Sequence, residues 1–209
     1  MTLSRREHWD HVYENTSANR HSWYQDSPAV SMKMIRDTGV PKEAPIIDVG
    51  AGVSTLVDVL LNSDYGAITV LDISNAAITQ ARIRLGDAAA NRVKWKQGDI
   101  LEWTPKGRYY LWHDRAVFHF MNDDTKVETY LKAMRTALVP GGFFVLATFG
   151  PEGPNRCSGL DVRRYAIEEL THLLEGDFEL RSYEIQDHTT PTGNQQQFLY
   201  SSWQMTGGW

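Results

Sequence analysis

The segment Ile46–Leu56 constrains the fold of this chain more than any other stretch. It reads Ile-Ile-Asp-Val-Gly-Ala-Gly-Val-Ser-Thr-Leu, an apolar run that leads through two glycines into a helical pattern. Glycines at positions 50 and 52 allow a sharp turn and a close approach of the backbone to a ligand, which a Cβ atom would prevent. A strand that enters a helix through such a turn predicts a site for a nucleoside-containing cofactor.

Acidic residues end two successive apolar runs. Asp48 ends the first run, and Asp72 ends the next one, Ile68–Leu71. Their separation is close to the roughly 20 residues at which a second strand presents a carboxylate to a ribose diol in dinucleotide-binding folds. We therefore expect Asp72 to bind a ribose.

Two classes of cofactor fit a glycine turn of this kind. A dinucleotide needs a small residue at position 55, where the helix faces a pyrophosphate, but this position holds Thr55. Asp48 would repel a pyrophosphate, whereas it suits the ammonium group of an amino-acid tail. S-adenosylmethionine (SAM) has such a tail, a ribose and no phosphate. We expect SAM, and keep a nicotinamide-dependent oxidoreductase as the less favoured alternative.

The glycine segment resembles motif I of the class I SAM-dependent methyltransferases, with Ser54 where many members have a third glycine. Further segments follow in the order of that family, between Pro45 and Thr148: Ser74 as a helix cap, Gly98-Asp99-Ile100, His113-Asp114-Arg115 and Pro140-Gly141-Gly142. The resemblance implies an enzyme that methylates a nitrogen, sulfur or oxygen atom of a small molecule or an exposed protein side chain. A non-catalytic SAM-binding partner or sensor is a second alternative.

Alternating strand and helix patterns predict an α/β fold with a doubly wound, mostly parallel sheet covered on both faces. The resemblance implies seven strands, the last of them antiparallel beside the fifth. Helices are expected over residues 55–62, 75–85, 125–138 and 165–174, and a hairpin turn over residues 187–194. We expect one SAM-binding catalytic domain, residues 41–209, preceded by an N-terminal helical extension or lid, residues 1–40.

The N-terminal segment is rich in aromatic residues. Trp9 and Tyr13 have the spacing of one helix face, and Trp23-Tyr24 stands in a turn before a helix that begins at Ala29. The segment is similar to that of lysine methyltransferases acting on elongation factors and of related small methyltransferases, where it covers the cofactor. Aromatic faces also stabilise a sulfonium cation. We expect a lid, and packing of this segment onto the sheet is the alternative.

The candidates for catalysis follow the fourth strand. His119 has an ordinary pKa that suits a general base, and Asp114 could orient His119 or the acceptor. The alternative is a buried histidine and an aspartate that caps a helix. A metal site is disfavoured, because adjacent residues at a strand end point to opposite faces. We expect the loop from Thr148 to Gly159 to form a wall of the acceptor pocket. Arg156 in this loop could bind an anionic acceptor or could be a surface residue.

The motifs and the resemblance together predict which residues contact SAM. In the related family Asp99 lies on the adenine amino group, and Ile100 packs against the ring. The expected cofactor contacts are Trp23, Asp48, Gly50, Gly52, Ser54, Thr55, Asp72, Ile73, Asp99, Ile100 and His113.

Charge and composition predict the partners and the compartment. A formal net charge of −5 at pH 7 provides no general attraction to nucleic acid or to an anionic membrane. No apolar run approaches the roughly 18 residues of a membrane span, and the first residues lack the apolar core of a signal peptide. The single cysteine, Cys157, fits a reducing compartment. We expect a cytoplasmic protein, while the acceptor and the oligomeric state stay open.

Overall fold

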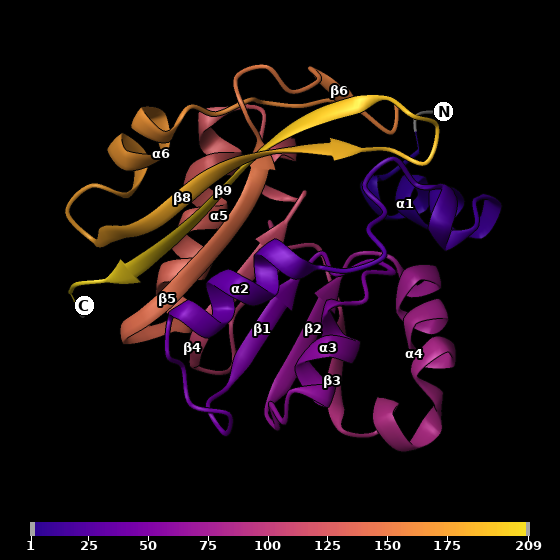
Figure 1. Ribbon diagram of the computed structural model, residues 1–209, viewed down its shortest axis with the longest axis horizontal. Coiled ribbons are helices and arrows are strands. Elements are labelled where there is room, and N and C mark those ends of the chain that lie inside the picture. Colours follow the sequence, from indigo (N-terminus) through magenta and orange to yellow (C-terminus); the bar gives the residue numbers. More distant parts are fainter. Residues whose placement is uncertain (1–2, 208–209) are drawn as a thin grey trace.

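A seven-stranded β-sheet organises the molecule (Figure 1). The computed structural model describes residues 3–207, and its strand order is β3-β2-β1-β4-β5-β9-β8. β1 to β5 run parallel to one another, whereas β9 pairs antiparallel with both β5 and β8. This order confirms the predicted fold class and the antiparallel last strand beside the fifth. The strands are β1 Ile46–Val49, β2 Ile68–Asp72, β3 Val93–Gln97, β4 Tyr109–Arg115, β5 Leu138–Phe149, β8 Phe178–Thr189 and β9 Gln195–Met205.

Helices cover the two faces of this sheet. On one face, α2, α3 and the end of α4 share an apolar cluster with side chains of β1 to β5 and β9, and α2 lies over β5 and β9. On the other face, α5 and α6 pack against β1, β4 and β5. Figure 1 shows α2 and α3 in front of the sheet and α5 behind it. The helices are α1 Arg5–Asn15, α2 Ala29–Asp37, α3 Leu56–Asn62, α4 Asn75–Ala90, α5 Asp124–Ala137 and α6 Ile167–Leu174, with short 3-10 turns η1 Ala18–Arg20 and η2 Phe118–Phe120.

Burial on both sides explains the central strands. All four residues of β1 and all five of β2 are buried, as expected for parallel strands between two helical layers. Side-chain caps fix the starts of two helices, and Ser74 is the cap that the sequence predicted. Ser74 accepts a hydrogen bond from Ala77 N, and Asp123 accepts one from Lys126 N, which fixes the starts of α4 and α5.

Three elements differ from expectation. The segment Pro140-Gly141-Gly142, which in the resembling family is a turn before the fifth strand, here lies within β5, since β5 begins at Leu138 and the β4–β5 register shifts there. α4 continues past Leu85 to Ala90, with a break in helical geometry at Gly86. A small hairpin of β6 Arg156–Cys157 and β7 Leu160–Asp161 was not predicted. Across residues 3–207, no helix combines the length and apolarity that a membrane crossing requires.

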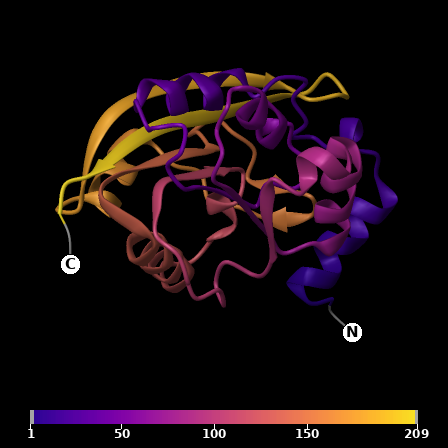
Figure 2. The same ribbon diagram turned by 90° about the horizontal axis from the view of Figure 1, so that it is seen from below.

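The N-terminal helix lies beside α4, as Figures 1 and 2 both show. Asp10 of α1 accepts hydrogen bonds from Ser74 Oγ (2.6 Å) and Ala76 N (3.2 Å) at the start of α4. One turn further along α4, Gln80 Nε2 donates to the carbonyl of Tyr13 (2.7 Å). A carboxylate at a helix N-terminus is stabilised by the unpaired amides and the helix dipole. These contacts hold the aromatic segment near the carboxyl ends of the strands.

Candidate functional site

A cavity of about 440 Å³ opens at the carboxyl ends of β1 to β4. Chemistry is expected at this edge of a doubly wound sheet. The predicted lid residues Trp9 and Tyr13 line it, whereas Tyr24, Arg156, Gly52 and Thr55 are not among its lining residues. The predicted cofactor contacts that line it are Trp23, Asp48, Gly50, Ser54, Asp72, Ile73, Asp99, Ile100 and His113.

The two glycines of the turn are required by close neighbours. Gly50 and Gly52 have φ of +62° and +55°, which strains other residues. A Cβ on Gly50 would lie 1.9 Å from Val117 Cγ2, and one on Gly52 would lie 2.4 Å from Tyr13 Oη. The turn therefore packs directly against the N-terminal segment and the segment after β4, in addition to facing the cavity.

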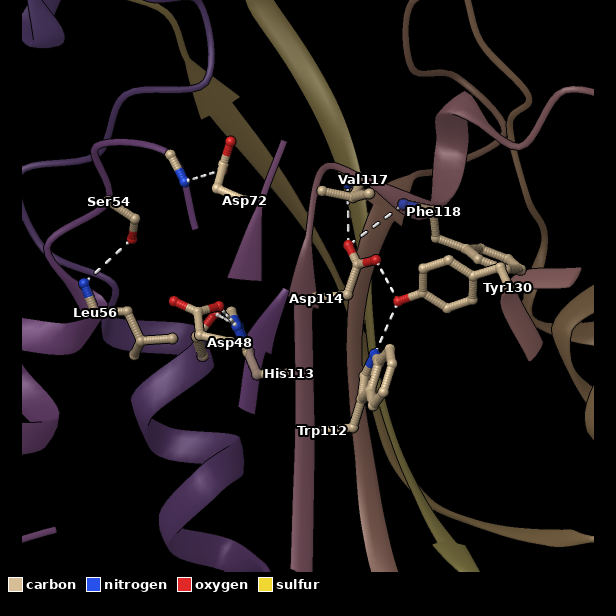
Figure 3. Close-up of polar contacts among 12 residues, drawn as sticks. Asp48, Ser54, Leu56, Asp72, Trp112, His113, Asp114, Val117, Phe118 and Tyr130 are labelled. Atoms are coloured by element: carbon tan, nitrogen blue, oxygen red, sulfur yellow. Dashed lines mark hydrogen bonds and ion pairs between the residues drawn. The ribbon is translucent and has the colours of Figure 1, made fainter. Parts of the chain in front are cut away.

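Asp72 ties the second strand to this turn. Its two carboxylate oxygens accept hydrogen bonds from Gly52 N (2.7 Å) and Ser74 N (2.8 Å). Burial raises the pKa of Asp72 to about 6, although both amide contacts favour the ionised form. Figure 3 shows its carboxylate beside the glycine turn. Asp72 therefore lies at the end of β2 and lines the cavity, while its binding of a ribose stays a prediction.

Asp48 is only half satisfied. Its Oδ1 lies 2.7 Å from His113 Nδ1 (Figure 3), and His113 Nε2 lies 2.9 Å from Ser31 Oγ. A neutral imidazole that donates from Nδ1 and accepts at Nε2 satisfies both contacts. The other oxygen, Asp48 Oδ2, is buried without a hydrogen-bond partner. A buried, unpartnered carboxylate oxygen is costly, so it is a natural contact for a donor in the cavity.

Arg115 lines the cavity, although the sequence analysis assigned it no role. Its Nε donates to Tyr200 Oη (2.9 Å), its Nη1 donates to the carbonyl of Trp23 (2.8 Å), and its guanidinium lies 4.6 Å above the ring of Phe198. Its Nη2 is buried without a partner, and within residues 3–207 no carboxylate lies within 4 Å of this cation. The available signal was strand alternation, which places Arg115 on the face of His113.

Asp99 already has a cationic partner. Arg5 of α1 reaches across the cavity edge, and its Nη2 lies 2.9 Å from Asp99 Oδ2. The other oxygen, Oδ1, accepts a hydrogen bond from Leu101 N (3.0 Å). Arg5 also lines the cavity, and no sequence motif had singled it out. The N-terminal helix thus contacts the position expected to read the adenine.

Asp114 lies on the far side of β4 from the cavity and does not line it. Its Oδ1 accepts from Val117 N (3.0 Å) and Phe118 N (3.3 Å), and its Oδ2 accepts from Tyr130 Oη (2.5 Å). Trp112 Nε1 donates to the same hydroxyl (2.9 Å), as Figure 3 shows. Burial raises the pKa of Asp114 to about 6. This geometry matches the alternative reading, an aspartate that caps a short helical turn.

His119 is also outside the cavity lining. Its side chain is fully buried, its ring stacks on Phe149 with centroids 4.2 Å apart, and neither ring nitrogen has a partner. Burial, with a smaller contribution from the charge of Arg115, lowers its pKa to about 3. This placement argues against a general base that exchanges protons with an acceptor, so the role given to His119 stays a prediction.

The cavity wall opposite the glycine turn comes from two segments. Residues after β4 contribute Val117, Phe120 and Met121, and the β6–β7 hairpin contributes Cys157 and Leu160. The predicted loop wall after β5 thus borders the cavity through this hairpin. Arg156 pairs with Asp161 (3.1 Å) on the outside and is largely exposed. Burial raises the pKa of the Cys157 thiol.

Comparison with known proteins places this architecture among the methyltransferases. Residues 47–144 match the profile of a family described as a methyltransferase domain. The chain is 24% identical over 160 residues to human EEF1A lysine methyltransferase 2, covering 70% of this chain and 68% of the human protein. It is 28% identical over 131 residues to trans-aconitate 2-methyltransferase of Rhizobium meliloti (strain 1021), covering 62% of this chain and 42% of that protein.

The fold has close counterparts among solved structures. The N-methyltransferase NodS from Bradyrhizobium japonicum WM9, solved in complex with S-adenosylhomocysteine (SAH), superposes with a TM-score of 0.69 at 16% identity. The alignment covers 96% of this chain and 100% of NodS. At this identity the likeness concerns the fold alone.

The buried network around Asp114 yields a stability prediction. Tyr130→Phe removes the hydroxyl that joins Trp112 Nε1 to Asp114 Oδ2. We expect the free energy of unfolding to fall by about 1–3 kcal/mol, because two buried polar atoms lose their partner. Urea denaturation measures this loss. Tyr110→Phe, at a half-exposed tyrosine, is the control and should leave stability unchanged. Equal stability of both variants would contradict the structural role of Asp114.

Proposed function

Because this chain belongs to the class I SAM-dependent methyltransferases, we propose that its cavity grips the amino-acid end of SAM between Asp48 and Arg115 and presents the methyl group to an acceptor beside η2 and the β6–β7 hairpin. One observation carries this proposal. Buried Asp48 and half-buried Arg115 carry opposite charges and line one cavity, and each has one buried polar atom without a hydrogen-bond partner.

The residues present fit an α-amino acid. Asp48 and Arg115 belong to the neighbouring strands β1 and β4, where Asp48 stands opposite His113, two positions before Arg115. An ammonium group beside Asp48 Oδ2 and a carboxylate beside Arg115 would supply both missing partners. Charge-assisted hydrogen bonds of this kind are the strong ones, and burial strengthens them further. When bound, SAM supplies a methyl group activated on a sulfonium centre.

The ribose and the adenine of SAM are proposed to contact the acidic residues on β2 and after β3. Asp72 is positioned to accept hydrogen bonds from ribose hydroxyls, since each carboxylate oxygen has a second lone pair beyond its amide contact. Asp99 borders the same cavity together with Ile100, which suits an adenine amino group and ring. These assignments are proposals, supported by the lining of the cavity and by the order of the acids along the sheet.

The N-terminal segment, residues 1–40 in our division of the chain, is proposed as a lid. The ring of Trp9 lies 5.9 Å from that of Trp23 and 5.2 Å from that of Phe120, and all three line the cavity. Aromatic faces stabilise a cation and exclude water from the path of transfer. Tyr13 is buried below them against the glycine turn. The lid therefore combines packing with a role at the site.

The acceptor is proposed to be a small molecule or an exposed protein side chain. Relatives named for each class exist, one for a lysine of EEF1A and one for trans-aconitate. Incubation with methyl-labelled SAM and fractionated cell extract separates the two classes, because label appears either in protein bands or in the small-molecule fraction. Label in neither would favour a non-catalytic SAM-binding module. A reducing compartment such as the cytoplasm suits the free thiol of Cys157.

We propose that positioning, and not a base from the chain, drives transfer. An in-line displacement gains most from holding the nucleophile at near-attack distance. Asp114 is saturated with donors, and His119 is buried outside the cavity lining. Asp161 lines the cavity but is paired with Arg156. The acceptor would then lose its proton to water.

The amino-acid clamp can be tested by comparing SAH with methylthioadenosine, which lacks the amino-acid end. Asp48→Asn and Arg115→Gln should each weaken SAH binding by roughly tenfold to a hundredfold, because each removes a charge-assisted hydrogen bond. Binding of methylthioadenosine should stay unchanged. Calorimetry with both ligands measures the difference.

Two controls sharpen this test. Arg92→Gln removes an exposed arginine and should affect neither ligand. Asp72→Asn should weaken both ligands, since both contain the ribose. If Arg115→Gln weakened SAH and methylthioadenosine equally, the variant would have disturbed the packing at Trp23 and Tyr200, and the clamp would be refuted.

The raised pKa of Asp72 predicts a pH dependence of binding. Its ionised form accepts the ribose hydroxyls, so binding favours loss of its proton, and affinity should fall as pH drops through about 6. By linkage, SAH should bind about tenfold more weakly at pH 5 than at pH 7.5. Calorimetry at the two pH values measures this, with Asp72→Asn as the control in which the dependence should vanish. A dependence that persists in Asp72→Asn would assign it to another group.

The absence of a base from the chain has its own test. His119→Phe keeps the stacking on Phe149 and removes the titratable ring. With the acceptor found by labelling, the pH profile of the transfer rate should keep its shape in this variant, because the proton leaves without help from His119. An inflection near the usual pKa of histidine that disappears in His119→Phe would restore the general base.

A further inference from the structure

Arg84 of α4 clamps the outer side of the glycine turn. Its Nη1 donates to the carbonyl of Val53 (2.6 Å), and its Nη2 donates to the carbonyl of Ser54 (2.7 Å). The same guanidinium pairs in a bidentate manner with Asp58 of α3, at 3.2 Å from Nε to Oδ1 and 2.7 Å from Nη2 to Oδ2. Four hydrogen bonds thus converge on one side chain that does not line the cavity.

Arg84 binds the turn at the position where many members of the family have a third glycine and this chain has a serine. Ser54 occupies that position, and its Oγ accepts a hydrogen bond from Leu56 N (3.1 Å), as Figure 3 shows. Because Arg84 takes up the carbonyls of Val53 and Ser54, these acceptors face α4. A bidentate pair with Asp58 fixes the plane of the guanidinium, which a single hydrogen bond would not do.

The same stripe of α4 also holds the N-terminal segment. Residues four positions apart lie on one helix face, and here Ala76, Gln80 and Arg84 follow that spacing. Ala76 N binds Asp10, Gln80 binds the carbonyl of Tyr13, and Arg84 binds the turn. Figure 1 shows α1 next to the end at which α4 begins.

We propose that Arg84 is a positioning residue for the cofactor, and that α4 couples the position of the N-terminal segment to the glycine turn through Gln80 and Arg84. The inference rests on the proposed function, since it requires that the turn hold SAM. Tyr13 connects the glycine turn to α4, because its hydroxyl packs against Gly52 while its carbonyl accepts a hydrogen bond from Gln80. A shift of the N-terminal segment at Gln80 would therefore move the glycine turn at Arg84, and a shift of the turn would move the segment.

The test is calorimetry of SAH binding to single variants of the full chain. Arg84→Met should weaken SAH binding by about tenfold, as expected for the loss of charged hydrogen bonds that act through the turn. Arg84→Lys should recover part of the affinity, because an ammonium can still donate to a carbonyl. Arg82→Met is the matched control on the same helix, where the arginine is exposed and bears on neither the turn nor the segment.

Coupling is tested by combining Arg84→Met with Gln80→Met. If the two residues act independently, the fold-loss of SAH affinity in the double variant should equal the product of the losses in the two single variants. If they are coupled, the loss in the double variant should be smaller than that product. If Arg84→Met does not fold, Asp58→Asn loosens the guanidinium while leaving Arg84 in place, and it should also weaken SAH binding.

The outcomes separate the two proposals. Wild-type affinity in Arg84→Met, or in Asp58→Asn where the first variant does not fold, would refute the positioning role. Losses that multiply would refute the coupling through α4. Failure of the wild-type protein to bind SAH would instead refute the proposed function, and that result is distinct from either of the others.

Discussion

The parallel pairing of β1 with β4 is the constraint on which the site depends. It places Asp48 opposite His113, so that one carboxylate oxygen is bound by the imidazole and the other is left for the cavity. Side chains alternate along a strand, so a slip of one residue would turn Arg115 away from the cavity and bring Asp114 toward it. The buried apolar residues of both strands fix the register, and with it the charge that each strand presents.

The buried carboxylates differ in how completely they are satisfied. Asp114 accepts from two amides and a tyrosine hydroxyl, which suits a fixed part of the scaffold. Asp72 is held by two amides, one of them from the cofactor turn itself, and its pKa is raised to about 6. Asp48 has one oxygen without a partner. Burial makes each missing partner costly, so the least satisfied acid is the one most suited to receive a ligand.

Local signals in the sequence were sufficient for the scaffold and for much of the cavity. The glycine turn, the Ser74 cap and the acids at strand ends depend on neighbouring residues, and the structure has them in place. The catalytic assignment of Asp114 overlooked strand alternation, which turns Asp114 to the face of β4 opposite to His113 and Arg115. Arg5 could not be found, because its partner Asp99 is distant in the chain and the contact exists only after α1 packs against α4. Such long-range contacts leave no periodic pattern.

The N-terminal segment and the cofactor would use the same polar groups, and this links their energies. Arg5 already occupies one oxygen of Asp99, so an adenine amino group would share that carboxylate with α1. The carbonyl of Trp23 is held by Arg115, the cation proposed for the carboxylate of SAM. A ligand that changes the geometry of either pair must change the position of the segment, and the segment must change the affinity by the same factor. On the proposal that the N-terminal segment is a lid, its closure would be a component of cofactor binding rather than a step that follows it.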